Sequence, residues 1–249
     1  MNSELAGKLE YLGLTSIRDQ YDAVTAAAAE KQLPLADYFA ELVEAEVAAR
    51  KARSARRRIR NAHFPCVKSI DDYDWTFPTR VNREQIMNLF TLGFLEQEKP
   101  GNVVFIGSAG VGKTMLGIAL GYEACRRCHD VRFTTAMDMV NHLRKAQTDG
   151  TLLHAMKAYT APELLVVDEL GYLPVEHDGA SLLFQVLSDR YERASTVVTS
   201  NLPYAEWIQL FGNDAAMTSA LLDRMLHHCT TVRIEGPSYR TENPRRPAG

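Results

Sequence analysis

The chain has 249 residues, of which 46% are hydrophobic and 24% charged, and its formal net charge is −3. These values are ordinary for a soluble globular protein that is long enough for one sizeable core and a small accessory domain. No apolar run approaches the ~18 residues of a membrane-spanning helix, and the start lacks a signal-peptide layout, so we expect a cytoplasmic protein with no membrane partner.

The first sixty residues are predicted to be helical. Leu5, Leu9 and Leu12 follow the i, i+4, i+7 spacing of one apolar helix face. Pro34 suits the first turn of a further helix, in which apolar residues continue at helical spacing through Val47. We therefore expect a small all-α N-terminal domain over residues 1–65, whose last helix runs into a cluster of basic residues.

That basic cluster contains six arginines and one lysine: Arg50, Lys51, Arg53, Arg56, Arg57, Arg58 and Arg60. Such a run is often only a solvated face. However, arginine favours bidentate hydrogen bonds to phosphate, and each neutralised phosphate releases counterions. Few aromatic residues interleave the run, which favours a duplex backbone over stacked single strands. The sequence thus predicts that these residues bind duplex DNA with little dependence on base sequence.

Residues 66–80 are predicted to form a linker that packs against another part of the chain, because the segment around them combines prolines, acidic residues and aromatic residues. Short apolar runs then alternate with helical patterns. The runs are Val103–Ile106, Val131–Thr134, Leu164–Asp168, Thr196–Ser200 and Thr231–Ile234, and the helical patterns include Thr114–Arg127, Ala136–Ala146 and Ser181–Arg193. This alternation is typical of a parallel sheet covered on both faces, so we predict an α/β domain over residues 81–249.

Four cysteines are too few for a disulfide framework in a chain of this size. Cys125 and Cys128 have the CxxC spacing of a redox pair or of half a zinc site. No second pair of this kind completes a ligand set, although His129, His227 and His228 are present. We therefore interpret the two cysteines as ordinary thiols on a helix.

Residues 107–114, GSAGVGKT, match the phosphate-binding pattern G-x-x-x-x-G-K-[ST] between a predicted strand and a predicted helix. The glycines let backbone N–H groups face phosphate oxygens, and the helix directs its positive end at the same anion. A glycine-rich turn that binds nothing is the weaker interpretation. The predicted ATP-binding residues are Gly107, Ser108, Ala109, Gly110, Val111, Gly112, Lys113, Thr114 and Met115, with Lys113 on the β- and γ-phosphates and the Thr114 hydroxyl on Mg²⁺.

Three further strand or helix ends carry candidate catalytic residues. The run LLVVDEL places Asp168 to hold the Mg²⁺ shell and Glu169 to polarise the attacking water, which favours hydrolysis over transfer to a second substrate. Asn201 could orient that water or contact the γ-phosphate, or simply cap the following turn. Arg224 could act on a neighbouring subunit's γ-phosphate, or form a surface pair with Asp223; the residues alone leave these two readings even.

Together these residues resemble the initiator and helicase-loader branch of the AAA+ ATPases, and in particular the IstB-like helpers of insertion-sequence transposases. The resemblance covers nearly the whole chain. The segments that carry it are YLGL (11–14), the basic helix end, YDW (73–75), GSAGVGKT, LLVVDELGYLP (164–174), LSDRYERASTVVTSN (187–201), LLDRMLHHC (221–229) and SYR (238–240).

The resemblance implies strand order 5-1-4-3-2, Asn201 as a sensor, and Arg224 as an intersubunit arginine finger. It also implies Arg240 as a candidate second sensor, although the residues after the last strand are too few for the usual helical lid. The implied function is an ATPase that forms a homo-oligomer on duplex DNA, remodels it and presents it to a transposase. A replicative helicase loader is the alternative, whereas a metabolic P-loop kinase or a non-hydrolysing scaffold would leave the basic helix or the Asp168-Glu169 pair without a role.

Overall fold

The structure is a computed structural model that describes residues 1–77, 80–171 and 177–242. It divides into two compact units, Met1–Arg57 and Arg58–Gly249. The division falls inside one long helix, earlier in the chain than the domain end expected at residue 65. Each unit is described by itself.

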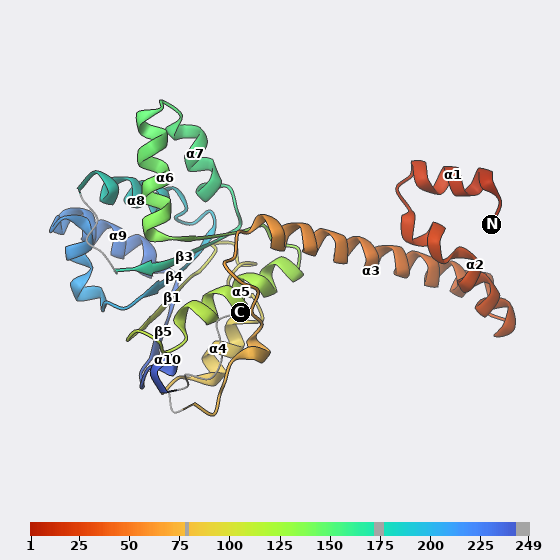
Figure 1. Cartoon of the computed structure of the whole chain (residues 1–249), viewed down its shortest axis with the longest axis horizontal. Coiled ribbons are helices and arrows are strands. Elements are labelled where there is room, and N and C mark those ends of the chain that lie inside the picture. Colours follow the sequence, from red (N-terminus) through yellow and green to blue (C-terminus); the bar gives the residue numbers. More distant parts are fainter. Residues whose placement is uncertain (78–79, 172–176, 243–249) are drawn as a thin grey trace. The chain divides into compact units, whose positions relative to one another are not determined.

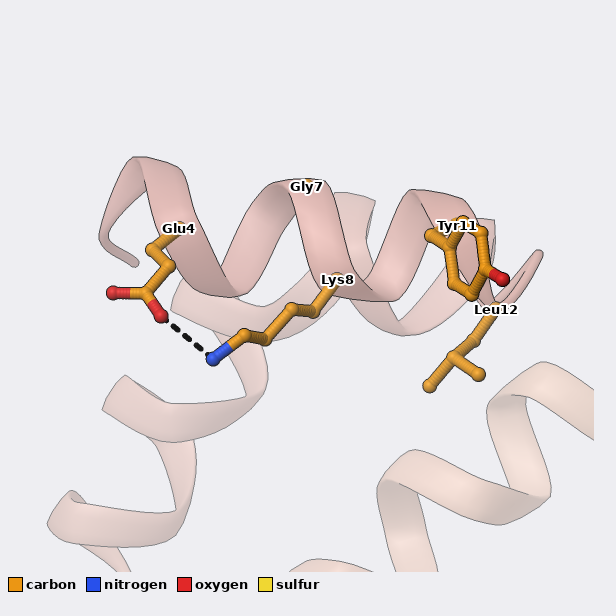
Figure 2. Close-up of a pocket in the computed structure, with 5 residues that line it drawn as sticks. All are labelled: Glu4, Gly7, Lys8, Tyr11 and Leu12. Atoms are coloured by element: carbon orange, nitrogen blue, oxygen red, sulfur yellow. Dashed lines mark hydrogen bonds and ion pairs between the residues drawn. The ribbon is translucent and has the colours of Figure 1, made fainter.

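The N-terminal unit is built from helices: α1 (Ser3–Tyr11), α2 (Thr15–Glu30) and the greater part of α3 (Leu35–Asn61) (Figure 1). Its apolar core is small, since Ala28 and Leu42 are its buried hydrophobic residues. Large apolar side chains remain exposed, including Tyr11 at 91% and Phe39 at 66%. A hollow of about 430 Å³ lies along α1, where the Lys8–Glu4 ion pair of 2.6 Å sits beside Tyr11 and Leu12 (Figure 2).

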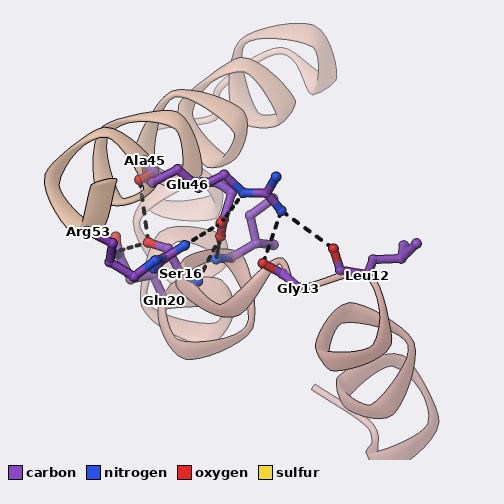
Figure 3. Close-up of polar contacts among 9 residues, drawn as sticks. Leu12, Gly13, Ser16, Gln20, Ala45, Glu46 and Arg53 are labelled. Carbon is purple, nitrogen blue, oxygen red and sulfur yellow. Dashed lines mark hydrogen bonds and ion pairs between the residues drawn. The ribbon is translucent and has the colours of Figure 1, made fainter. Parts of the chain in front are cut away.

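A buried carboxylate organises this unit. Glu46 of α3 is 4% exposed, and its Oε2 accepts hydrogen bonds from the backbone N–H groups of Ser16 (2.8 Å) and Ile17 (3.2 Å) (Figure 3). These N–H groups belong to the first turn of α2, whose N-cap residue Leu14 has no side-chain acceptor. Glu46 therefore supplies from another helix the cap that the local sequence lacks.

Two arginines complete this Glu46 cluster. Glu46 Oε1 accepts from Arg50 Nε (3.0 Å) and Arg53 Nη2 (2.9 Å), and Arg50 Nη2 also donates to the Gly13 carbonyl at 3.1 Å. Burial by itself would raise the pKa of Glu46, but the hydrogen bonds from Arg50, Ile17 and Ser16 outweigh it and hold that pKa below its usual value. The cluster thus ties the turn between α1 and α2 to α3.

The C-terminal unit contains a five-stranded, all-parallel sheet of order β2-β3-β4-β1-β5, which confirms the predicted order 5-1-4-3-2. The strands are β1 (Asn102–Gly107), β2 (Val131–Thr135), β3 (Leu164–Leu170), β4 (Ser195–Ser200) and β5 (Cys229–Ile234). The helices are η1 (Ile70–Asp72), α4 (Arg83–Leu89), α5 (Lys113–Arg126), α6 (Ala136–Thr148), α7 (Leu152–Thr160), α8 (His177–Asp189), η2 (Tyr204–Phe211), α9 (Ala215–His227) and α10 (Tyr239–Glu242).

Alternate residues of the buried strands face two separate apolar cores, as the period of two in a strand requires. Val104, Leu165 and Val167 pack with α6, α7, α8 and α9 on one face. Phe105 and Val166 pack with α4, α5 and the segment around Tyr73 on the other. The sheet is therefore covered on both faces, and the ends of its strands are left to carry polar residues (Figure 1).

The expected linker is part of the second core. Tyr73 is buried there, and Arg80 forms an antiparallel bridge with Glu235, just after β5. The backbone hydrogen bonds of that bridge are 2.6 and 3.1 Å long. The described residues of this segment thus pack against the predicted phosphate loop and against the end of β5.

Helix α8 ends at Asp189, before the predicted Arg193, and the backbone cannot continue as a helix through Glu192, whose φ is +55°. Arg190 is 1% exposed, and its guanidinium donates to five acceptors around the amino-terminal ends of β3 and β4. These are Thr196 Oγ1 and the carbonyls of Tyr159, Pro162, Glu163 and Ser195. Arg190 thus supplies donors to four buried backbone carbonyls, of which that of Glu163 also accepts from Ser195 N at 3.0 Å.

Candidate nucleotide-binding site

The predicted phosphate loop lies at the carboxyl edge of the sheet, between the end of β1 and the start of α5. Gly110 and Gly112 have φ angles of +80° and +98°, a region that favours glycine. Gly112 is also the N-cap residue of α5, so the first backbone N–H groups of that helix have no side-chain cap. They are available to an anion, as in other helix-terminal phosphate sites.

Close approach explains the glycines as well. A Cβ on Gly107 would overlap the Ile234 carbonyl oxygen of β5, and a Cβ on Gly112 would lie 3.0 Å from the Tyr73 ring. The loop is therefore held between β5 and the 66–80 segment. A hollow of about 250 Å³ opens beside it, with Gly107, Ser108 and Pro203 among the lining residues.

Lys113 is 7% exposed and its ammonium donates to two carbonyls of its own loop, Gly107 O at 2.8 Å and Ser108 O at 2.7 Å. Burial lowers the pKa of Lys113, the Asp168 carboxylate acts in the opposite direction, and Arg240 lowers it further. The Lys113 side chain is thus held over the loop, and the charges of both Asp168 and Arg240 act on it.

Asp168 connects the end of β3 to the phosphate loop. It is 3% exposed, and its Oδ1 accepts from Thr114 Oγ1 at 2.9 Å and from Thr199 Oγ1 of β4 at 2.5 Å. The two residues predicted as magnesium ligands are therefore hydrogen-bonded to each other. Sequence analysis did not identify Thr199 as a residue of the site. Its position two residues before Asn201, on the same predicted strand, could have indicated it.

Glu169 has a different environment. Its side chain is exposed, its φ is +61°, and the β3–β4 register shifts between Val167 and Leu170. Its N–H donates to Thr199 Oγ1 at 3.0 Å. A non-glycine residue with this backbone is strained by about 1–2 kcal/mol, and the irregular register leaves the Glu169 side chain exposed next to the buried Asp168.

Asn201 follows β4 at the same edge. Among the described residues its Oδ1 is buried without a hydrogen-bond partner, which is uncommon for a buried carbonyl oxygen. A Cβ on Gly171, just after β3, would lie 2.8 Å from that oxygen. Asn201 therefore lies against the backbone that follows the Asp168 strand, and a capping role for its Oδ1 is not seen.

Arg224 lies on α9, away from this cluster. Its Nη1 donates to the Ala220 carbonyl at 3.1 Å, and its guanidinium lies 5.5 Å from the Phe184 ring centroid. The structure does not bring it to the phosphate loop of its own chain. Asp223, the expected surface partner, forms no ion pair with it among the described residues, and its side chain is exposed.

The segment after β5 folds over the phosphate loop. Tyr239 N donates to Gly110 O at 2.9 Å, and a Cβ on Gly110 would overlap Ser238. The Tyr239 ring contacts Phe77 of the 66–80 segment at 4.9 Å. Arg240 is exposed on the short helix α10, close enough to lower the pKa of Lys113, whereas the expected frayed end at residues 243–249 lies outside the described residues.

The seven basic residues predicted to bind DNA have different surroundings. Arg50 and Arg53 belong to the Glu46 cluster, and Arg58 forms an ion pair with Asp130 at 2.9 Å. Arg50 and Arg53 are nevertheless 53% and 48% exposed, and the other exposed residues of the run are Lys51, Arg56 and Arg57 in the N-terminal unit and Arg60 in the C-terminal unit. Charge alone did not distinguish the two groups.

The cysteines are free thiols. Cys125 is buried on α5, and burial raises its thiol pKa to about 12, whereas Cys128 lies just past the helix with a φ of +72°. Within the residues that the structure describes, no helix is long and apolar enough to cross a membrane.

A family model described as IstB-like ATP binding protein matches residues 7–247. The chain belongs to this family. It is 36% identical to the ATP-binding protein of insertion sequence IS5376 from Geobacillus stearothermophilus, over 94% of this chain and 92% of that protein. It is 35% identical to the corresponding protein of insertion sequence IS21 from Pseudomonas aeruginosa, over 98% of this chain and 91% of that one.

Two solved structures have a similar fold. The DnaI crystal structure superposes with a TM-score of 0.58 at 18% identity, covering 72% of this chain and 93% of that one. The DnaC helicase loader gives 0.54 at 19% identity, covering 71% and 98%. The chain is thus a member of a family of ATP-binding proteins, and its fold is similar to those of DnaI and DnaC.

Proposed function

We propose that this protein is an ATP-dependent, DNA-binding assembly factor that prepares duplex target DNA for the transposase of its insertion sequence. The observation that carries the proposal is the phosphate loop with Thr114 bonded to Asp168, in a chain whose relatives are insertion-sequence ATP-binding proteins. Replicative helicase loading is the second candidate, supported by the likeness of fold to DnaC and DnaI.

The residues of the site fit a nucleotide and its metal ion. Gly107 and Gly112 leave a cradle that a Cβ would fill, and the unpartnered Asn201 Oδ1 lies at the same edge. Residues 107–115 would hold the phosphates, and Thr114 and Asp168 would hold Mg²⁺ by exchanging their mutual hydrogen bond for ligation. The ion would neutralise charge on the phosphate oxygens.

Four side chains of the protein would each have a separate role in hydrolysis. Lys113 would leave the carbonyls of Gly107 and Ser108 for phosphate oxygens, which are stronger acceptors for an ammonium. Glu169 would accept a proton from the attacking water, and Asn201 would orient that water. Arg240, beside Lys113, would contribute charge from the segment after β5.

Arg224 would act on a neighbouring subunit. The structure does not bring Arg224 to the phosphate loop of its own chain, and the residue lies on the partly exposed helix α9. Both features suit a guanidinium that is offered to a second copy of the chain. Hydrolysis would then depend on assembly, since the charge that stabilises the transition state comes from the next protomer.

The proposal is tested by ATP hydrolysis and particle size, with and without duplex DNA, for wild type, Lys113→Ala, Glu169→Gln and Arg224→Ala. We expect Lys113→Ala to lose nucleotide binding and Glu169→Gln to assemble without turnover. Arg224→Ala should bind ATP but lose DNA-stimulated hydrolysis by about 10³-fold. Arg126→Ala, an exposed arginine of α5, is the matched control and should behave as wild type.

Mixing Lys113→Ala with Arg224→Ala protein makes the test specific for action between subunits. The first variant offers an intact Arg224 and the second an intact phosphate loop, so mixed assemblies should regain part of the activity that each variant lacks. Full DNA-stimulated hydrolysis by Arg224→Ala alone would show that the assembly-coupled mechanism is wrong. Turnover by a monomer, independent of DNA, would indicate a small-molecule kinase instead.

DNA binding is tested by neutralising Lys51, Arg56 and Arg57 together. Loss of three phosphate contacts should weaken duplex binding and reduce the slope of log affinity against log salt by about 2–3. The control neutralises Lys8, Arg18 and Lys31, the same number of charges in the same unit. If the two triple variants weaken duplex binding equally, the basic run is a solvated face and not a DNA-binding site.

The partner is tested by co-purification with the product of the adjacent reading frame. An integrase with an acidic catalytic triad that binds the ATP-loaded assembly on DNA supports the transposition role. Binding to a replicative helicase instead would favour the loader role.

A further inference from the structure

Three potential metal ligands meet at the amino-terminal edge of the sheet, the edge opposite to the phosphate loop. Glu192 lies in the turn between α8 and β4, His227 is the last residue of α9, and His228 precedes β5. In the sheet, β4 and β5 are the two neighbours of β1. The turns that precede β4 and β5 therefore lie at the same edge of the sheet. We call these three residues the Glu192 cluster.

The ligand atoms of the cluster are already close. Glu192 Oε1 lies 3.8 Å from His227 Nδ1 and 3.7 Å from His228 Nε2, and one ligand atom from each residue lies within 4.8 Å of the others. In a tetrahedral zinc site, bond lengths near 2.1 Å separate neighbouring ligand atoms by about 3.4 Å. Side-chain adjustments of less than ~1 Å would therefore close the cluster around one ion.

One of these atoms lacks a partner. His228 Nε2 is buried and makes no hydrogen bond to any described residue, although buried polar atoms are normally satisfied. The 3.7 Å to Glu192 is too long for a hydrogen bond. A metal ion between the two groups would satisfy both.

Two neighbouring side chains contact ligand atoms of the cluster. Lys99 Nζ lies 2.8 Å from Glu192 Oε1, so the carboxylate already holds one cationic group. Tyr191 OH lies 2.8 Å from His227 Nδ1, and this contact would be exchanged for ligation when an ion binds.

We propose that Glu192, His227 and His228 bind one divalent transition-metal ion, of which Zn²⁺ is the representative, with water in the remaining position. Two imidazoles and one carboxylate suit Zn²⁺ and its first-row neighbours, whereas Mg²⁺ and Ca²⁺ prefer oxygen ligands. The ion competes with the Lys99 ammonium for Glu192. It pins the end of α9, the helix that carries Arg224, to the turn before β4.

The experiment is titration of metal-free full-length protein with Zn²⁺ by calorimetry, followed by Co²⁺ absorption to identify the ligands. Wild type should bind near one equivalent, and its Co²⁺ spectrum should lack a thiolate charge-transfer band. Glu192→Gln and His228→Gln should each weaken binding by more than about tenfold. Lys99→Met should strengthen it about two- to fivefold, since a competing surface ion pair is removed.

His129→Gln is the matched control, because His129 also contacts a single glutamate, Glu163, at 2.6 Å but has no second histidine beside it. It should leave the zinc affinity unchanged. Absence of stoichiometric binding would overturn the proposal. So would binding that survives Glu192→Gln and His228→Gln, or binding that is lost in Cys125→Ser, Cys128→Ser protein with a thiolate band in the wild type.

Discussion

The N-terminal unit and the ATPase unit, residues Arg58–Gly249, are stabilised in different ways. The first buries Ala28 and Leu42 as its hydrophobic residues and is tied together by the polar contacts of Glu46. The second encloses a sheet between two large apolar cores. Small helical units bury little apolar surface, so a buried ion pair with a capping role gains importance there. Changes of the same type should therefore differ in cost between the units.

The two tryptophans, Trp75 and Trp207, both lie in the ATPase unit, so their fluorescence reports its unfolding. Far-ultraviolet circular dichroism reports the helices of both units. Hydrogen exchange of α2 amides reports the N-terminal unit. Denaturant titrations followed by these three signals separate the stabilities of the two units.

The largest effect is expected for Arg190→Lys in the ATPase unit. Lysine has three donors on one atom and cannot reach five acceptors spread over a guanidinium fork, so buried carbonyls lose their partners. We expect the free energy of unfolding of this unit to fall by about 4 kcal/mol, measured by tryptophan fluorescence. Arg126→Lys, an exposed arginine of α5, should change it by less than about 0.5 kcal/mol. Equal stabilities of the two variants would contradict the buried role of Arg190.

A similar but smaller loss is expected for Gly107→Ala. The new Cβ overlaps the backbone oxygen of Ile234 and lies 3.1 Å from Val111 Cγ2, so β5 must move away from β1. Overpacking of this kind costs about 3 kcal/mol, read by tryptophan fluorescence, and nucleotide affinity should fall with it. Wild-type stability in this variant would mean that the β1–β5 contact yields easily.

Glu46→Gln should destabilise the N-terminal unit by about 2 kcal/mol, because a neutral amide weakens the charge-assisted bonds to Arg50, Arg53 and the first turn of α2. The measurement is hydrogen exchange of α2 amides, which should accelerate while tryptophan fluorescence stays unchanged. Glu44→Gln, an exposed glutamate two residues earlier on α3, is the control. A similar acceleration in both would assign the effect to net charge.

The same carboxylate predicts a pH dependence. The pKa of Glu46 is lower in the folded protein than the ordinary 4.5, so the unfolded chain takes up the proton more readily. Its contribution is therefore complete above pH 4.5 and is lost as the pH falls through the folded pKa. Exchange of α2 amides should rise over that acidic range in wild type more than in Glu46→Gln.

Local patterns predicted the strands and the phosphate loop, because short apolar runs and the glycine spacing of residues 107–114 are properties of short segments. The strand order, which depends on the whole sheet, was predicted only from the family resemblance. They did not predict Arg190, Thr199 or Glu46, whose roles depend on carbonyls and N–H groups brought together by tertiary packing. The contacts of Arg50 and Arg53 with Glu46 were not predicted either, and their DNA binding stays a prediction. Charge placed them in a DNA-binding run, while their acceptor Glu46 lies on the buried side of the same helix.

The smallest effect is expected for Gly13→Ala, the counterpart in the N-terminal unit of Gly107→Ala. Gly13 has a φ of +67°, and a Cβ there would meet Arg50 Nη2 at 3.7 Å, an ordinary contact with a flexible side chain. The cost is then that of the left-handed backbone alone, about 1 kcal/mol, and it should appear in α2 exchange without a change in tryptophan fluorescence. Gly7→Ala, in open space within α1, is the control and should be neutral or slightly stabilising. A loss at Gly13 as large as that at Gly107 would mean that the α1–α2 turn is packed as tightly as the phosphate loop, and the contrast between the two units would fail at that point.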